Sequence, residues 1–177
     1  QKLEIIKLKA FLEKIGILNK INFDIEEVGE PIPFKWGKCK LATVSFGHGI
    51  TTTPLQLAKA YAIISNGGFA VEPSLIKNEL KNYQKKKRII KAGVSEKINP
   101  ILRKIVTTKE GTAGLVNIEG YEVGGKTGTA QKTIVGGYSK AKVNTFAGIF
   151  PASNPKYVLV VLLDEPKTSS DYVYEYK

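Results

Sequence analysis

The chain has 177 residues, of which 42% are hydrophobic, so it can bury a core as one domain or as a large part of one. Its net charge is +11, but only Arg88 and Arg103 among the 27 basic residues are arginines, which argues against a nucleic-acid partner. No apolar run reaches the roughly 18 residues of a membrane span, and Cys39 is the single cysteine, which excludes an internal disulfide. Because methionine is absent, we expect a processed or excised piece of a longer protein.

Two helices are predicted in the first half of the chain. Over residues 2–15 apolar side chains recur near helical spacing, and Gly16 ends the pattern. A loop-rich stretch is expected from there to about residue 46. The clearest helix runs over 54–66, where Thr53 can cap the first turn, a proline takes the first helical position and a glycine follows the last residue. Apolar side chains cover most of its circumference, so we expect it to be deeply buried.

Strands dominate the second half. Short extended pieces with lysine-rich turns are expected over 69–91, followed by a helix over 100–108 with Asn99 as its cap. Hairpin-like links separate the strand candidates that follow. Adjacent strands behind helices predict an α+β fold, an antiparallel sheet with packed helices. The strand candidates are 121–131, 143–151 and 157–164.

The most informative motif is the run Lys126-Thr127-Gly128-Thr129 within the first strand candidate. The two-residue period of a strand sends Lys126 and Gly128 to one face and Thr127 and Thr129 to the other. A cation then lies beside a gap with no side chain, and paired hydroxyls can hold a carboxylate. An open strand edge can also bind an extended peptide through main-chain hydrogen bonds. The pattern indicates a site for the acidic end of a peptide next to a nucleophile.

A competing interpretation is a phosphate-binding loop. Residues 120–127 satisfy the pattern G-x-x-x-x-G-K-T, and 158–165 resemble the apolar strand with terminal acids that often accompanies it. Such a loop must open directly into a helix whose amide groups hold the anion. Residues 128–130 and 134–137, which include three glycines, cannot sustain such a helix. A nucleotide-binding ATPase is therefore kept as the alternative.

Two further candidate sites have simpler explanations. Cys39 and His48 could form a thiol–imidazole pair, but a lone cysteine and a lone histidine nine positions apart are more simply unrelated. Asp164 and Glu165 could act as acid and base, yet at a strand end they are more simply a solvated cap. We expect neither a metal site nor a cofactor.

The Lys-Thr-Gly triplet resembles the third motif of a set, Ser-x-x-Lys, Ser-x-Asn and Lys-Thr-Gly, shared by penicillin-binding proteins and serine β-lactamases. Residues 45–61, 124–131 and 146–152 resemble class B penicillin-binding proteins, and most of all the septal, cell-division transpeptidases. The resemblance covers nearly the whole chain. It implies that residues 1–177 are the C-terminal part of a single transpeptidase domain, truncated at both ends, with a partial penicillin-binding protein or serine β-lactamase-like fold.

The chain departs from this set of motifs in two ways. Ser-x-Asn is absent, and Ser-x-x-Lys begins at Ser74, Ser139 and Ser153 in a chain so rich in lysine that chance matches are expected. The nucleophilic serine of the family opens a buried helix upstream of anything that matches Gln1. We therefore expect the nucleophile to lie outside this chain and the isolated piece to be inactive.

The resemblance implies a serine-type peptidoglycan D,D-transpeptidase that cross-links stem peptides through an acyl-enzyme and binds penicillin. In that role Lys126 helps to activate the serine, and the hydroxyls of Thr127 and Thr129 hold the substrate carboxylate. The backbone N–H of Thr129 is one oxyanion donor. Gly128 is small because a side chain there would collide with the helix of the serine.

Partners and placement follow from the same resemblance. The expected ligands are peptidoglycan stem peptides and β-lactam antibiotics, and the expected protein partners are cell-division membrane proteins. The resemblance places the protein at the periplasmic face of a bacterial inner membrane, through an N-terminal span absent from this sequence. A non-catalytic β-lactam sensor of the same fold is a second alternative.

Overall fold

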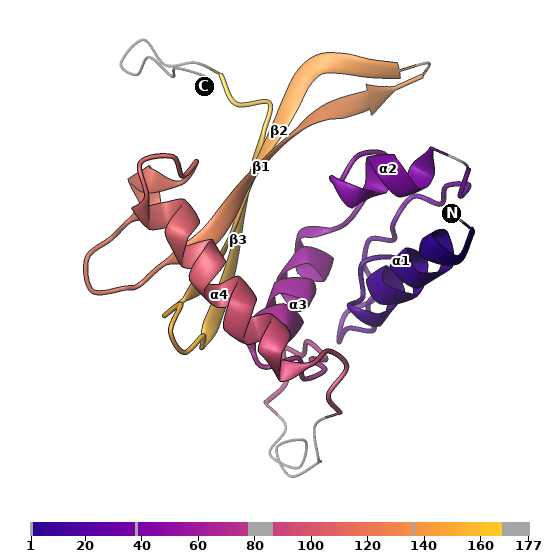
Figure 1. The fold of residues 1–177 in the computed structure, drawn as a ribbon. Coiled ribbons are helices and arrows are strands. Elements are labelled where there is room, and N and C mark those ends of the chain that lie inside the picture. Colours follow the sequence, from indigo (N-terminus) through magenta and orange to yellow (C-terminus); the bar gives the residue numbers. More distant parts are fainter. Residues whose placement is uncertain (1, 38, 78–86, 136, 168–177) are drawn as a thin grey trace.

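The structure is a computed structural model that describes residues 2–37, 39–77, 87–135 and 137–167. Four α-helices, a short 3-10 helix and three strands make up the regular structure within these ranges (Figure 1). None of the described helices has the length and apolar character needed to cross a bilayer. The elements are α1 (Lys2–Lys14), α2 (Lys40–Ser45), α3 (Pro54–Ser65), α4 (Ala92–Thr107), η2 (Gly114–Val116), β1 (Gly124–Ile134), β2 (Gly137–Phe150) and β3 (Tyr157–Asp164).

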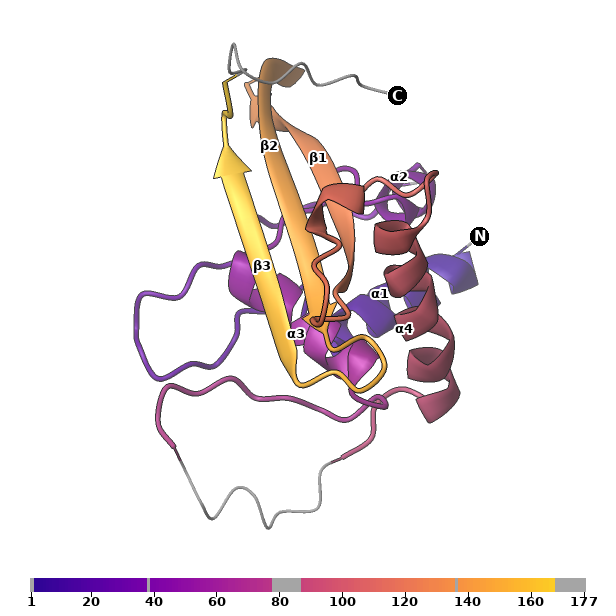
Figure 2. The same ribbon diagram turned by 90° about the vertical axis from the view of Figure 1, so that its left-hand side faces the viewer.

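The three strands form one antiparallel sheet in the order β1-β2-β3. Figure 2 shows the strands side by side, with α3 behind the sheet and α4 along the side of β1. Helix α4 packs against β1, and α3 packs against β2 and β3. The predicted α+β fold, helices on an antiparallel sheet, is therefore confirmed.

The strand predictions differ from the structure mainly at one hairpin. β3 has the predicted bounds, whereas β1 runs on to Ile134 and β2 begins at Gly137, earlier than the predicted start at residue 143. Pairing continues past an irregularity in the β1–β2 register, which lengthens both strands. Gly136, expected in the link between them, lies outside the described residues.

Helix α3 begins as the sequence predicts and is joined to α1 by one buried side chain. Thr53 Oγ1 accepts from the Gln56 N–H at 3.2 Å, and the Thr53 N–H donates to Gln56 Oε1 at 2.8 Å, a capping box. The Gln56 side chain is fully buried. Its Nε2 donates to the carbonyl oxygens of Ile17, at 3.2 Å, and Asn19, at 2.7 Å. One glutamine thus satisfies polar groups of the helix start and of the chain that leaves α1.

A small hydrophobic core lies between the end of α1 and α3. Its buried members are Ile15 and Ile17 from the first segment and Ala60 and Ile63 from the helix. Much of the rest of α3 is half-buried, so the predicted deep burial holds for one face only. The half-buried apolar side chains of α3 are Leu55, Leu57, Ala58, Tyr61, Ala62 and Ile64.

The predicted start of α4 is wrong. The helix begins at Ala92, so Asn99 is not its cap and Pro100 lies inside it. Asn99 Nδ2 instead donates to the Ser65 carbonyl oxygen at 3.0 Å. The buried Ser95 accepts from the Gly67 N–H at 3.0 Å through its hydroxyl. These bonds hold the first half of α4 against the end of α3, although the sequence of that half gives only a weak helix signal. They also help to offset the backbone hydrogen bond that α4 lacks at Pro100, which has no N–H.

Helix α2 lies in a stretch that was expected to be loop. It has only six residues and no side-chain cap, so hydrophobic periodicity carries no signal for it. Lys40 holds the following turn, because its Nζ donates to the Gly49 carbonyl oxygen at 2.8 Å. This bond connects the first residue of the helix to the chain that follows its last turn.

The substitution Gln56→Leu tests the buried junction. It keeps the bulk but leaves the Ile17 and Asn19 carbonyl groups and the Thr53 N–H without their partner. Because each buried unpaired group is costly, we expect the free energy of unfolding to fall by at least about 2 kcal/mol in urea titrations of the full-length protein. The exposed Gln131→Leu is the control and should change stability little. A Gln56→Leu variant as stable as wild type would contradict this account.

Candidate active site along the edge of β1

The Lys126–Thr129 segment lies in a regular strand at the edge of the described sheet. Lys126 is opposite Ala147 of β2, and Thr127 is opposite Phe146. We call the sheet face that carries Lys126 and Ala147 the helix-side face, because α3 and α4 pack against it, and the face that carries Thr127 and Phe146 the outer face. The predicted alternation of lysine and threonines between two faces follows from this pairing.

The same pairing shows that the phosphate-loop interpretation is wrong. β1 continues in register with β2 from Gly124 to Gln131, and no helix begins after Thr127. The backbone amides there belong to a strand, so the nest of N–H groups and the helix N-terminus that hold a phosphate are missing from this segment.

The Lys126 side chain is exposed and its ammonium group lies along the strand edge. Nζ donates to the Thr127 carbonyl oxygen at 2.6 Å and lies 3.4 Å from Thr127 Oγ1. The amine thus contacts a hydroxyl that the sequence assigned to carboxylate binding. The arrangement concentrates positive charge beside the open edge of β1.

A second hydroxyl joins this group. Thr112 Oγ1 lies 2.7 Å from Thr127 Oγ1, so the two side chains share a hydrogen bond. Thr112 belongs to the segment between α4 and β1, which passes over β1 in Figure 2. Sequence reasoning missed Thr112, because the contact depends on how this segment folds back. Thr129, two residues along the strand, is exposed.

Close packing explains two of the three glycines in and before the motif. A Cβ on Gly124 would lie 3.1 Å from the Arg103 backbone nitrogen of α4. A Cβ on Gly125 would collide with the Phe146 ring and lie 2.7 Å from the Ala147 carbonyl oxygen. Both glycines therefore let β1 approach α4 and β2. Gly128 differs, because its Cβ would meet nothing nearer than a carbonyl oxygen at 4.0 Å.

Helix α4 also fixes where β1 begins. Arg103 Nη1 donates to the Val123 carbonyl oxygen at 2.7 Å, directly before the strand. Leu102 and Val106 of the same helix are buried, as is Ile149, which pairs with Gly124. The entry to the motif is therefore held by packing and by a hydrogen bond on the helix-side face.

Asp164 and Glu165, considered as an acid and base, are both paired with one lysine. Lys132 Nζ lies 2.7 Å from Asp164 Oδ1 and 2.7 Å from Glu165 Oε1. Hydrogen bonds to Asp164 and then to Glu165 raise the pKa of the Lys132 ammonium group. The two carboxylates thus belong to an ion-paired cluster at the end of β3.

Cys39 and His48 are not brought together. Cys39 is exposed and directly precedes α2. The His48 ring instead lies against Tyr138, with ring centroids 4.8 Å apart, and more loosely against Phe46 at 6.1 Å. The structure therefore gives no support to a thiol–imidazole pair.

The three Ser-x-x-Lys matches have hydroxyls engaged in local structure. Ser74 Oγ donates to Asp24 Oδ2 at 2.7 Å. Ser139 lies in β2 and accepts from a backbone N–H two residues on, at 3.1 Å. Ser153 follows β2 and its hydroxyl bonds to Glu122. None of the three serines opens a helix, which agrees with their interpretation as chance matches.

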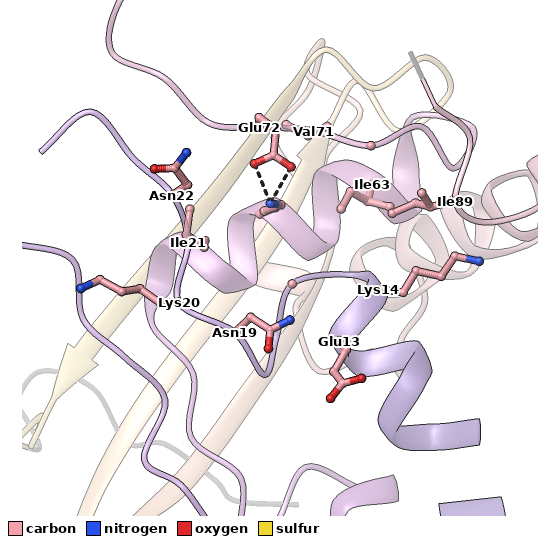
Figure 3. A pocket seen from close by; sticks show the side chains of 13 residues that line it. Glu13, Lys14, Asn19, Lys20, Ile21, Asn22, Ile63, Val71, Glu72 and Ile89 are labelled. Carbon is pink, nitrogen blue, oxygen red and sulfur yellow. Dashed lines mark hydrogen bonds and ion pairs between the residues drawn. The ribbon is translucent and has the colours of Figure 1, made fainter. Parts of the chain in front are cut away.

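A cavity of about 350 Å³ lies elsewhere, between the end of α1, the chain that follows it, and α3. Two of its lining residues form an ion pair, in which Lys59 Nζ lies 3.1 and 3.0 Å from the two oxygens of Glu72, and dashed lines mark these contacts at Glu72 in Figure 3. The Lys14 and Lys20 side chains point away from the cavity. None of its lining residues comes from β1. Across the described ranges, no group of three or more His, Cys, Asp or Glu side chains is placed to hold a metal ion.

Residues 1–176 match the penicillin binding protein transpeptidase domain, and the chain belongs to this family. It is 37% identical over 140 residues to a probable peptidoglycan D,D-transpeptidase PenA of Neisseria flavescens, which covers 78% of the chain and 34% of that relative. The chain thus spans about a third of the length of this relative.

Solved structures agree with the sequence match. The transpeptidase domain of penicillin-binding protein 3 from Burkholderia pseudomallei superimposes with a TM-score of 0.82 at 27% identity, over 92% of this chain and 50% of that one. Penicillin-binding protein 3 from Mycobacterium tuberculosis, complexed with aztreonam, gives a TM-score of 0.79 at 28% identity, over 89% and 40%. The described fold is therefore that of part of a transpeptidase domain.

The two glycines Gly125 and Gly128 should respond differently to alanine. Gly125→Ala forces a Cβ against the Ala147 carbonyl oxygen, which is backbone and has little room to move. We expect this variant to lose about 1–3 kcal/mol of unfolding free energy. Gly128→Ala places its Cβ in open space, so its stability should stay near wild type. Thermal melts of the two variants check this, and equal losses would contradict the packing described here.

Proposed function

We propose that residues 1–177 form the C-terminal part of the transpeptidase domain of a serine-type peptidoglycan D,D-transpeptidase. In this proposal the chain supplies the strand edge that binds substrate, and the nucleophilic serine comes from a part of the domain outside this sequence. The observation that carries the proposal is the placement of Lys126, Thr127 and Thr129 along the open edge of β1. Membership of the transpeptidase family supports it.

The edge suits an acyl donor that ends in a carboxylate. The hydroxyls of Thr127 and Thr129 donate hydrogen bonds to that carboxylate, while the Lys126 ammonium group adds positive charge beside them. An extended peptide can pair with the open main-chain edge of β1 as an added strand, in which case it replaces Lys126 Nζ as the partner of the Thr127 carbonyl oxygen. Together these contacts hold a stem peptide, or a β-lactam that mimics it, in one orientation.

The Thr129 N–H serves as an oxyanion donor in the proposed mechanism. The Thr127 carbonyl oxygen accepts a hydrogen bond from Lys126 Nζ. This contact supports an orientation in which the main-chain N–H and C=O groups of Thr127 point away from β2. Alternate residues of a strand face the same way, so the Thr129 N–H also points to the open edge. One such donor typically contributes about 2.7–4 kcal/mol to lowering the barrier.

The reaction has two steps. The serine oxygen attacks the carbonyl carbon of the D-Ala-D-Ala amide, the C–N bond breaks, and the terminal D-Ala leaves as an amine that takes the serine proton. The acyl-enzyme is then attacked by the amine of a neighbouring stem peptide, whose lost proton returns to the serine oxygen. Lys126 assists both steps by stabilising the deprotonated serine and its proton relay.

The wider role in this proposal is septal peptidoglycan cross-linking at the periplasmic face of a bacterial inner membrane. A membrane span outside residues 1–177 anchors the protein, and cell-division membrane proteins are its partners. The ligands are stem peptides and β-lactams, with neither metal nor cofactor. Support for β-lactam binding comes from the matched penicillin-binding protein 3 that was solved with aztreonam.

Replacement of Lys126 tests the proposed site in the full-length protein. Lys126→Ala removes the charge beside the nucleophile but no packing contact, because the side chain is exposed. We expect acylation by a fluorescent penicillin to slow at least about a hundredfold, with an unchanged melting temperature. Lys140→Ala, an exposed lysine on the same hairpin, is the control. Wild-type acylation by the Lys126 variant would show that the assignment is wrong.

The isolated chain gives a second test. Purified residues 1–177 should neither label with fluorescent penicillin nor cross-link stem peptides, because Ser74, Ser139 and Ser153 are engaged elsewhere in the fold. Intact-mass spectrometry after incubation with penicillin measures this directly. A covalent adduct on any serine of this piece would overturn the proposal that the nucleophile lies outside it. Cross-linking by the full-length protein distinguishes an enzyme from a β-lactam sensor of the same fold.

A further inference from the structure

Lys132 connects β1 with the far strand of the sheet. Its Nζ lies within 2.7 Å of one oxygen each of Asp164, the last residue of β3, and Glu165. Because the strand order is β1-β2-β3, these ion pairs pass across β2. The cluster formed by Lys132, Asp164 and Glu165 is called the carboxylate clamp below.

The register shows how the clamp crosses the sheet. Ala130 is opposite Val143, which is in turn opposite Asp164. Two strand spacings amount to about 10 Å, a span that calls for a side chain as long as lysine. By the two-residue period, Lys132 lies on the same helix-side face as Lys126 and Ala130.

The clamp coincides with the point where the β1–β2 ladder breaks. Regular pairing ends at Gln131 and Lys142 and resumes at Thr133 and Tyr138, so Lys132 of β1 lies opposite residues 139–141, the irregular stretch of β2. Beyond it β1 and β2 stay paired with each other past the last β2–β3 pair, and Tyr138 contacts the His48 ring. Such an irregularity bends the ladder, and here it lies opposite Lys132, which is three residues from Thr129 along β1.

Glu165 is held in an unusual backbone conformation beside the clamp. Its φ of +48° lies in the left-handed region that a residue with a side chain rarely adopts. Its N–H donates to the Lys142 carbonyl oxygen of β2 at 2.9 Å, which fixes the backbone there. The carboxylate is therefore anchored to the middle strand while it binds Lys132.

We propose that Lys132 is a positioning residue for the Thr129 oxyanion donor: the carboxylate clamp ties edge strand β1 to β3 and stops motion of the hairpin from reaching Thr129. The inference rests on the function proposed above. β1 is hydrogen-bonded to one neighbour only in the described sheet, so a second tie limits how far its backbone shifts. Small displacements of a catalytic donor reduce rates strongly.

The clamp contributes little to global stability, which separates positioning from folding. The Lys132 side chain is 34% exposed, and those of Asp164 and Glu165 are 57% and 58% exposed. Ion pairs this exposed are screened by solvent and change unfolding free energies only slightly. Loss of the clamp should therefore leave a folded protein with a displaced site.

The test uses the full-length protein and the concentration dependence of acylation by a fluorescent penicillin. Lys132→Met keeps the apolar stem and removes the charge. We expect the acylation rate constant to fall about three- to tenfold, while the dissociation constant of the initial complex changes less than about twofold. The rate constant should change more than the dissociation constant because an oxyanion donor acts in the transition state and not on the bound ligand.

Three comparisons make the result specific. Lys140→Met removes a lysine of the same hairpin that pairs with no carboxylate in the described part of the chain, and it should leave the rate constant unchanged. Lys132→Arg should restore most of the rate. The double variant Asp164→Asn with Glu165→Gln should lower the acylation rate constant as much as Lys132→Met does. Adding Lys132→Met to this double variant should lower the rate constant no further, because both changes remove the same interaction.

A wild-type rate constant in Lys132→Met, or in the carboxylate double variant, overturns the inference. Should Lys132→Met fail to fold, the double variant alone decides, because it keeps lysine and the shape of both carboxylates. Failure of the proposed function looks different: wild-type protein would not be acylated, or Lys126→Ala would acylate at the wild-type rate. Equal losses of rate and melting temperature without rescue by Lys132→Arg would show a purely structural role and overturn the inference too.

Discussion

The hydrogen-bonded pairing of β1 with β2 is the interaction on which the site depends. It occupies one edge of β1 and leaves the other edge of this strand open in the described sheet. It also sets the alternation that sends Lys126 to the helix-side face and Thr127 to the outer face. Gly124 and Gly125 permit the close contacts that hold this register. An ammonium group, hydroxyls and the open main-chain edge of β1 are thereby placed together.

The helices position this strand through polar contacts as much as through apolar packing. Arg103 holds the residue before β1, and Ser95 joins α4 to the end of α3. At the other end of α3, the buried Gln56 binds the chain that leaves α1. Buried polar groups with satisfied partners favour one arrangement over its alternatives. A continuous set of contacts therefore runs from α1 to the motif.

The sequence predicted the elements whose signals are local. An apolar run of strand length after turn residues predicted β3, and the capping residues predicted the start of α3 at Pro54. Helix α2 and the first half of α4 were missed, because tertiary contacts rather than caps or periodicity fix them. At the site, residue type and strand period predicted how Lys126 is placed. Thr112 and the carboxylate clamp were not predictable, since they depend on segments far apart in sequence that meet only in the fold.

A crystal structure of the full-length protein acylated by a β-lactam tests the central claim most directly. The account predicts an ester to a serine outside residues 1–177. It also predicts the ligand carbonyl oxygen within hydrogen-bond distance of the Thr129 N–H, and the ligand carboxylate on the hydroxyls of Thr127 and Thr129. An acyl group whose oxygen and carboxylate bind elsewhere, with the edge of β1 unoccupied, would contradict it.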